Sequence, residues 1–278
     1  MGVQVRTPPG AHHHHQPMNS LLLSIALLSP AQDPEVKPPT EARVEQAIKE
    51  LSEAFAKKGD SEAKMQAITL SSEVLHPKVI EWIAKGLKDS DDEVRAAVIE
   101  SLRYMEHSDA NDVLVKTLRR DKKLRKNPEL YEALIKAVCQ HADPKSFSLI
   151  ADFKLNDETR DTIRARIYGI ARYRTTDSVE ELFDVMKRFG KNRVQPYMGE
   201  LSTALMVLTG VDQGKSQTAW TRWWNDNKRD LEVSEELPKL PKKTLASWSK
   251  YWGLELPEER RKRRGERGDD PEGDGDKK

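Results

Sequence analysis

Short polar breaks recur along the middle of the chain at a nearly constant spacing, and they constrain the fold more than any other feature. The breaks at residues 76–77, 108–109, 143–144 and 176–177 lie 32 to 35 residues apart. Each contains Asp, Ser, Thr or Pro, residues that favour the first turn of a helix. A repeat of this length, made of helix pairs, is typical of a solenoid in which each unit stacks on the next.

The segments between the breaks have helical periodicity. Apolar residues recur three and four positions apart in 43–55 and again in 77–88. The segment 94–104 aligns without gaps on 163–173, two periods later. From Glu41 to about Val233 no segment has the alternating β-branched pattern of a strand. With 37% apolar and 33% charged residues, the composition suits a thin array of amphipathic helices, so we predict an all-α fold.

The stretch "HPKVIEWIAKGLKDSDDEVRAAVIESLRYM", residues 76–105, resembles a HEAT repeat, with a proline that opens the first helix and Val-Arg that opens the second. The resemblance covers roughly residues 41–210. It implies a right-handed α-solenoid of roughly four or five HEAT-like helix pairs. It also implies hydrogen bonds in a ladder between repeats, at whose positions this chain has Asp89 with Arg95 and Glu158 with Arg164.

The N-terminal part of the sequence reads as a signal for export. In residues 1–31 an apolar run, Leu21–Leu28, precedes Ser29-Pro30-Ala31, whose small residues suit cleavage after Ala31. The run is shorter than the roughly 20 residues of a membrane span. The four histidines at 12–15 precede this site, and either Met1 or Met18 can be the start. We therefore expect a periplasmic or secreted mature protein.

The remaining chain divides by composition into four parts. Residues 32–40 are a proline-rich linker, 41–210 the HEAT-like repeat solenoid, 211–257 a tryptophan-rich C-terminal cap, and 258–278 a charged tail. The tail has no apolar residue, so we expect it to be disordered.

The motif "GVDQGKS", residues 210–216, is one residue short of a phosphate-binding loop. Such a loop needs a strand before it and four residues between its glycines. Here an apolar helical pattern precedes the motif, and Asp212 would repel a phosphate. We therefore interpret Gly210 as the left-handed end of one helix and Ser216 or Thr218 as the cap of the next.

Two aromatic clusters follow at helical spacing, which places the side chains of each cluster on one helix face. Their tryptophans are Trp220, Trp223, Trp224, Trp248 and Trp252. We expect them to cap the open end of the solenoid core; an aromatic platform for a sugar, a base or a peptide is the alternative. The string "LTG…G…AWTRWW" also resembles the C-terminal segment of HEAT-repeat proteins of planctomycete-type bacteria.

Several arginines fall on the expected second helices, which line the concave side of HEAT-type stacks. We expect Arg103, Arg166 and Arg172, together with Tyr173, to contact a partner there. Carboxylates such as Glu100, Asp161 and Glu180 are interspersed, and the net charge is only +1, so the pattern also fits an ordinary solvated face.

No residue pattern predicts a catalytic, cofactor or metal site. Cys139, the only cysteine, lies in an apolar helical stretch and is expected to be buried and inert. His76, His107 and His141 recur at 31 and 34 residues but fall at helix ends, where His is common. A row of metal ligands is the alternative interpretation.

The sequence thus predicts a non-catalytic, exported scaffold of bacterial HEAT type that binds a protein along its concave helical face. The alternative is a nucleic-acid-binding or base-processing HEAT-like enzyme that uses an arginine-lined groove. The identity of the protein partner and the oligomeric state are not encoded in any recognisable pattern.

Overall fold

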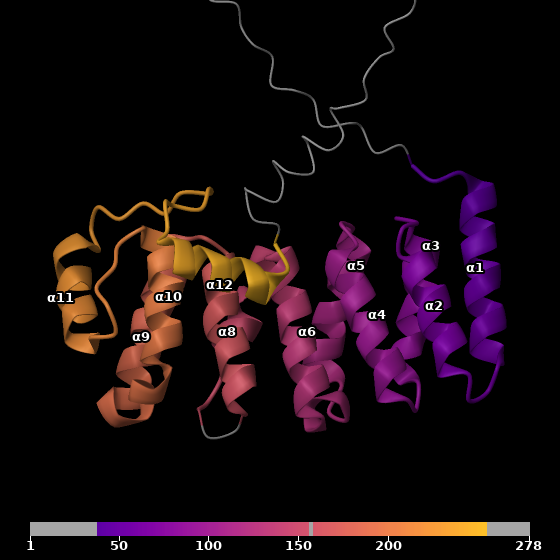
Figure 1. Ribbon diagram of the computed structural model, residues 1–278, viewed down its shortest axis with the longest axis horizontal. Coiled ribbons are helices and arrows are strands. Elements are labelled where there is room, and N and C mark those ends of the chain that lie inside the picture. The colour runs from indigo at the N-terminus through magenta and orange to yellow at the C-terminus, as the bar shows by residue number, and fades with distance from the viewer. Residues whose placement is uncertain (1–37, 156–157, 255–278) are drawn as a thin grey trace, which may run out of the picture. The chain divides into compact units, whose positions relative to one another are not determined.

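The computed structural model describes residues 38–155 and 158–254, which fall within one compact unit, Pro38–Lys278. Within these residues every regular element is an α-helix or a short 3-10 helix, and successive helices stand side by side (Figure 1). This confirms the predicted all-α solenoid. The expected signal peptide at 1–31, most of the linker and the charged tail at 258–278 lie outside the described residues.

Five helix pairs make up the array in the described part of the chain. The first helices are α1 (Glu41–Ala56), α3 (Pro77–Lys85), α5 (Ser108–Arg120), α7 (Phe147–Ala151) and α9 (Thr176–Val194). The second helices are α2 (Ser61–Ser71), α4 (Asp92–Tyr104), α6 (Pro128–His141), α8 (Arg160–Arg172) and α10 (Met198–Thr209). Each second helix packs on its own first helix and on the second helices of the neighbouring pairs.

The helices begin where the recurring breaks predict. At four starts the side chain before the helix accepts a hydrogen bond from a backbone N–H of the first turn. These capping residues are His76, His107, Asp143 and Thr175. Since two of the three regularly spaced histidines cap helices through Nδ1, their recurrence follows from the repeat.

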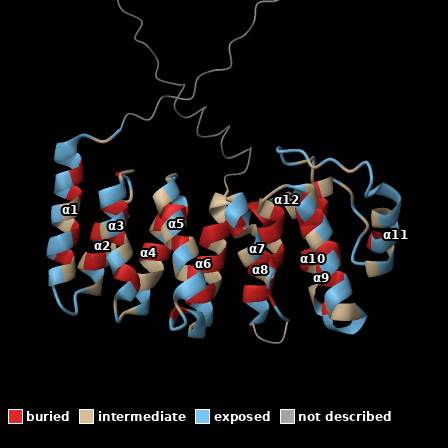
Figure 2. Cartoon of the chain, turned by 180° about the vertical axis from the view of Figure 1, so that it is seen from behind, coloured by how far each residue is buried: buried red, intermediate tan, exposed pale blue. Residues whose placement is uncertain are grey.

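The core lies between the first and second helices, and buried positions recur along the inner side of each helix (Figure 2). Leu102, Leu134, Ile135 and Ile170 are each no more than 1% exposed. Burial of each such side chain contributes about 1.5–3 kcal/mol. Because every pair leaves part of its apolar surface to the next pair, the core continues along the array.

A close contact between α6 and α8 buries the single thiol. A Cβ at Gly169 would overlap the Sγ of Cys139, so only glycine allows the two helices to approach this closely. Cys139 is fully buried, and burial raises the pKa of its thiol to about 12. The structure therefore places it in the core.

We expect the Cys139 thiol to be almost unreactive toward a thiol reagent at neutral pH while the protein is folded. Its raised pKa keeps the thiolate fraction very small, and burial excludes the reagent. Reaction followed spectroscopically with and without denaturant checks this. Equal rates in the native and the unfolded chain would contradict the burial.

Beyond the fifth pair the chain turns at the loop that contains GVDQGKS. Gly210, with φ 73°, ends α10, and Ser216 caps α11 (Gln217–Asn227), as the sequence predicts. The carbonyl of Gly214 accepts hydrogen bonds from Trp220 Nε1 at 2.8 Å and Ser202 Oγ at 2.6 Å. The element before this loop is the helix α10, whereas a phosphate-binding loop requires a strand there.

The segment after α11 returns along the array to a last helix, α12 (Lys242–Trp252). Arg174, in the left-handed conformation with φ 51°, fixes this route. Its guanidinium donates hydrogen bonds to the main-chain carbonyls of Ser234, Glu236 and Val207. None of the helices in the described part of the chain is long and apolar enough to cross a membrane.

Candidate interaction face

The last helix lies across the second helices instead of closing the end of the array. In Figure 1 α12 crosses in front of α8, and its contacts reach α4, α6 and α8. The Tyr168 ring of α8 packs edge-on against Trp248, with ring centroids 5.5 Å apart, and against Tyr251 at 5.0 Å. We call the surface of α4, α6 and α8 that α12 contacts the second-helix face; it carries Arg103, Lys136, Tyr168 and Arg172.

The C-terminal end of α12 is held by arginines. Arg103 donates a hydrogen bond of 3.0 Å to the main-chain carbonyl of Trp252. The Arg172 guanidinium lies 5.3 Å from the centroid of the Trp252 ring, and that ring is fully buried. The carbonyls at a helix C-terminus carry partial negative charge, so these cations stabilise the docked helix.

Gly253 ends α12 and lets the chain turn away from the second-helix face. It has the left-handed conformation with φ 68°. A Cβ built at Gly253 would lie 2.7 Å from the Tyr104 hydroxyl, too close for any side chain without movement. The left-handed backbone and the close approach to the Tyr104 hydroxyl both favour glycine at residue 253.

The cations beneath α12 are partly desolvated. Burial lowers the pKa of Lys136 below its ordinary value, and nearby Arg103 lowers it further. Burial also lowers the pKa of Arg172. Lys136 lies 4.5 Å from the centroid of the Tyr251 ring, which replaces part of its lost hydration. The second-helix face is thus a basic, aromatic surface that a helix covers.

Buried polar groups without hydrogen-bond partners offset part of the free energy that docking of α12 contributes. Five buried donor atoms in it have no hydrogen-bond partner within the described residues: Arg103 Nε, Arg172 Nε, Trp248 Nε1, Tyr251 OH and Trp252 Nε1. Each unsatisfied buried group costs about 1–3 kcal/mol. Aromatic burial consequently has to supply most of the affinity of α12 for the face.

The structure separates the residues that the sequence grouped as partner-contacting. Arg103 and Arg172 lie on the second-helix face, under α12. Arg166 instead points to the interior, where it pairs with Glu158 at 2.7 Å and donates to the carbonyls of Leu149 and Ile150. Tyr173 packs its ring edge-on against Phe147 of α7. Arg166 and Arg172 are six positions apart on α8, which places them on different sides of the helix.

The residues expected to form a hydrogen-bond ladder between repeats also have other partners in the structure. Asp89 pairs with Lys64 of the preceding repeat at 2.8 Å, while Arg95 pairs with Asp92. Arg164 contacts Asp161 at 3.0 Å, and Glu158 pairs with Arg166 instead. The loops between paired helices differ in length, so residues at equivalent sequence positions do not meet equivalent partners.

Polar contacts between neighbouring repeats exist at other positions. The side-chain amide of Asn127 donates to Asp92 at 2.6 Å, and that of Asn111 donates to Asp143 at 2.9 Å. The Ser61 hydroxyl bonds to Asp91. These pairs join one repeat to the next with Asn and Ser donors, residue types that the family pattern did not single out.

The two tryptophan clusters have different places. In α11, Trp220 is fully buried, and the Trp224 ring stacks on Phe183 of α9 with centroids 4.9 Å apart. Trp223 packs edge-on against Trp220. This cluster lies beside the last pair, where a cap was expected. Trp248 and Trp252, by contrast, cover the second-helix face.

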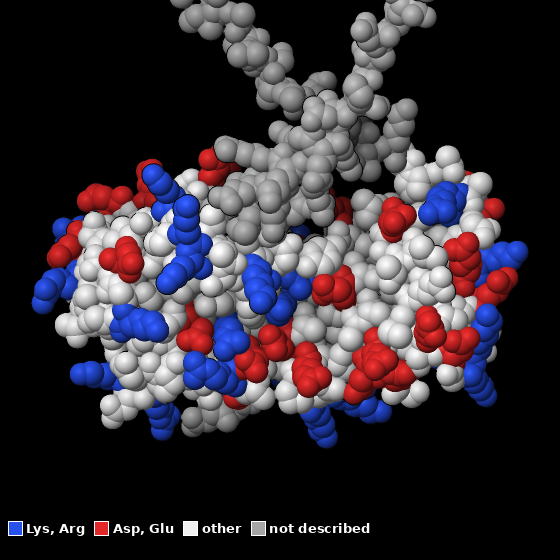
Figure 3. Space-filling model, in the orientation of Figure 1, with Lys and Arg blue, Asp and Glu red and all other residues white. Residues whose placement is uncertain are grey.

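The second-helix face has a neighbouring exposed apolar surface and mixed charge. Leu70 and Tyr104, at the C-terminal ends of α2 and α4, are about half exposed. Both acidic and basic side chains are present on the part of this side that Figure 3 shows uncovered. Tyr104 is a contact residue that the sequence analysis missed, because one exposed tyrosine at a helix end gives no periodic signal.

The third regularly spaced histidine has a structural partner as well. His141 Nε2 lies 2.9 Å from the carbonyl of Leu102, and burial lowers the pKa of the imidazole. Within residues 38–155 and 158–254, no group of three His, Cys, Asp or Glu side chains is placed to hold a metal ion.

Comparison with known proteins agrees with the architecture. The chain matches a protein-family model described as HEAT repeats over residues 48–127, which runs from α1 to the start of α6. No curated protein matches the chain significantly. The match to HEAT repeats covers residues 48–127, and the helix pairs beyond it continue the same stacked arrangement.

Proposed function

We propose that the protein is a non-catalytic interaction scaffold that binds a helical, aromatic segment of a protein partner on its second-helix face. One observation carries the proposal: α12 lies on this face with Trp248 and Trp252 buried. Helices laid in grooves by regularly spaced apolar anchors are a common recognition mode. HEAT repeats commonly serve as protein-interaction scaffolds, which supports the same reading.

A partner would bind by replacing α12. Among the described residues, the contact of α12 leaves five buried donors without a hydrogen-bond partner and desolvates Lys136 and Arg172. A segment that pairs with these groups can therefore compete. The competing segment would carry aromatic residues three or four positions apart and acceptors for the arginines. Half-exposed Tyr104, beside Gly253, extends the surface beyond the end of α12.

The nucleic-acid alternative finds less support. A groove that tracks a phosphate backbone needs a continuous basic stripe. Arg166 is in the interior, Glu100 pairs with Arg103 at 3.4 Å, and the visible face carries carboxylates as well as cations (Figure 3). Mixed charge of this kind favours a protein surface as the ligand.

The test is whether the face binds the helix when another molecule presents it. We would measure fluorescence anisotropy of a labelled peptide of residues 242–252 with the full chain carrying Gly253→Val. This change forces a Cβ against Tyr104 and strains a left-handed position, so it loosens α12 while leaving every repeat side chain in place. We expect the variant to bind the peptide at least about ten-fold more tightly than the wild type, where α12 competes in cis.

Two controls make the result specific. Gly190→Val also strains a left-handed glycine but meets no atom within 4 Å, so it should bind the peptide as weakly as the wild type. A peptide with both tryptophans changed to alanine should not bind. The proposal fails if Gly253→Val is folded by circular dichroism and still does not bind the tryptophan peptide.

We also propose that the protein is exported, on the strength of the apolar run and the small residues before position 32. Intact-mass measurement of protein expressed from the full sequence in a bacterial host checks this. The expected chain begins at Gln32, whereas a recovered chain that retains residues 18–31 would refute it.

A further inference from the structure

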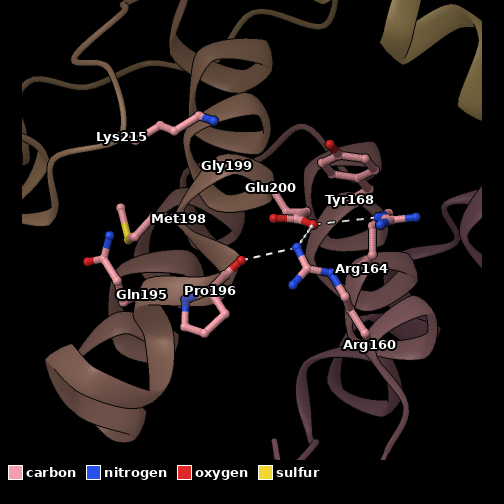
Figure 4. Close-up of a pocket in the computed structure, with 9 residues that line it drawn as sticks. All are labelled: Arg160, Arg164, Tyr168, Gln195, Pro196, Met198, Gly199, Glu200 and Lys215. Carbon is pink, nitrogen blue, oxygen red and sulfur yellow. Dashed lines mark hydrogen bonds and ion pairs between the residues drawn. The ribbon is translucent and has the colours of Figure 1, made fainter.

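A pocket between α8 and the start of α10 gathers cationic side chains. Its volume is about 430 Å³. Its charged and aromatic lining side chains are Arg160, Arg164 and Tyr168 of α8, Glu200 of α10 and Lys215 of the GVDQGKS loop (Figure 4). A cavity of this size accommodates a small ligand.

A nearly buried carboxylate positions the two arginines. Glu200, with a side chain only 10% exposed, accepts a hydrogen bond of 3.0 Å from Arg160 and lies 3.6 Å from Arg164 Nε. Arg160 also donates to the carbonyl of Pro196 at 3.2 Å. Arg164 also pairs with Asp161 at 3.0 Å. These contacts occupy only some of the five N–H donors that each guanidinium carries.

Lys215 approaches the same space from the opposite side. A Cβ at Gly199 would be 3.7 Å from Lys215 Cε and 3.8 Å from Nζ, so the lysine lies along this bare stretch of α10. In Figure 4 its ammonium points across Gly199 toward the side of the pocket that holds Tyr168. No carboxylate of the described residues lies within 4.0 Å of the Lys215 ammonium.

The lining residues alone carry three cations and one carboxylate, a net charge of +2 (three minus one), and Asp161, outside the lining, pairs with Arg164. We propose that this pocket binds a phosphomonoester dianion. Arginine presents paired donors to phosphate oxygens, and lysine adds a point charge. The charge of the dianion balances that of the lining, and a tetrahedral group suits donors that converge from α8 and from the loop before α11.

The site is unlike a nucleotide-binding loop. Of the GVDQGKS segment only Lys215 lines the pocket, and the backbone N–H of Gly214 is donated to Asp212 at 2.8 Å. The pocket has room for the phosphate and a small attached group. Tyr168 both lines it and packs against Trp248, so the pocket adjoins the second-helix face and shares this one residue with it.

The experiment is isothermal titration of the full chain at constant ionic strength with inorganic phosphate, O-phosphoserine and a capped peptide that contains phosphoserine. Lys215→Ala should weaken phosphate binding about ten-fold or more, as expected for loss of one charge-assisted contact. The exposed side chain should leave the thermal midpoint unchanged. Lys122→Ala removes the same charge from an exposed position between α5 and α6 and should bind like the wild type.

The two esters distinguish the source of the phosphate. Tighter binding of O-phosphoserine indicates a small metabolite, and tighter binding of the peptide indicates a modified protein segment. The proposal is overturned if Lys215→Ala binds phosphate as the wild type does, or if chloride at the same ionic strength gives the same heat. Neither outcome depends on whether the second-helix face binds a helix.

Discussion

Replacing Trp252 by alanine is expected to lower the free energy of unfolding by about 3–5 kcal/mol. The indole is fully buried between α12 and the second-helix face, and Arg103 and Arg172 both contact this residue. Its removal leaves a cavity beside two partly desolvated guanidinium groups. Urea denaturation followed by far-UV circular dichroism measures the loss without relying on tryptophan fluorescence.

Trp82 provides the matched control. It is the one tryptophan outside the two clusters, is only partly buried on α3, and has Lys85 over its ring at 3.1 Å. Trp82→Ala should cost clearly less than Trp252→Ala, because less surface leaves water on folding. Equal losses would show that Trp252 is not anchored in the way the structure describes.

Arg166→Met is expected to cost a similar amount, about 3–5 kcal/mol, because it leaves the Glu158 carboxylate buried without its partner. The two side chains are 4% and 10% exposed and lie 2.7 Å apart. The guanidinium also donates to the Tyr131 hydroxyl at 2.7 Å and to two carbonyls of α7. The same denaturation experiment measures this loss.

The double variant separates charge from hydrogen bonding. Changing Glu158 to methionine in the Arg166→Met background removes the unpaired charge and should recover part of the stability. Recovery should be incomplete, because the carbonyls of Leu149 and Ile150 still lack their donor. Arg43→Met, at an exposed pair with Glu73, should cost no more than about 1 kcal/mol. If Arg166→Met cost as little as Arg43→Met, the buried pair would be disproved.

The sequence predicted the fold well because its signals are local. Capping at His76, His107, Asp143 and Thr175 depends on residues within one turn, and the periodicity of apolar side chains depends on one helix at a time. Gly210 was identified for the same reason, since a helix that ends in a left-handed glycine carries its own signal.

The candidate site was less predictable because it joins residues far apart in the chain. Arg103 meets the carbonyl of Trp252, 149 positions away, through a route that Arg174 fixes on the segment before α12. Periodicity placed Trp248 and Trp252 on one helix face but could not say which surface that face covers. It also could not distinguish Arg166, in the interior, from Arg172, one to two turns later on the second-helix face.

The pocket beside α10 shows how a rejected motif can still contribute a residue. The GVDQGKS segment lacks the strand context of a phosphate-binding loop, and the structure has a helix before it. Lys215 nevertheless reaches a pocket that contains Arg160 and Arg164. Only the packing of α8 against α10 brings these three cations together, so no linear pattern could indicate them.

Hydrogen exchange of the full chain, read by mass spectrometry over residues 242–254, tests the central claim most directly. The account predicts that the backbone amides of α12 are protected in the wild type, because docking on the second-helix face holds the helix in place. It predicts that Gly253→Val removes this protection while the amides of α4, α6 and α8 within the repeat core remain protected. Exchange of 242–254 in the wild type as fast as in the isolated peptide would contradict the claim that α12 covers this face.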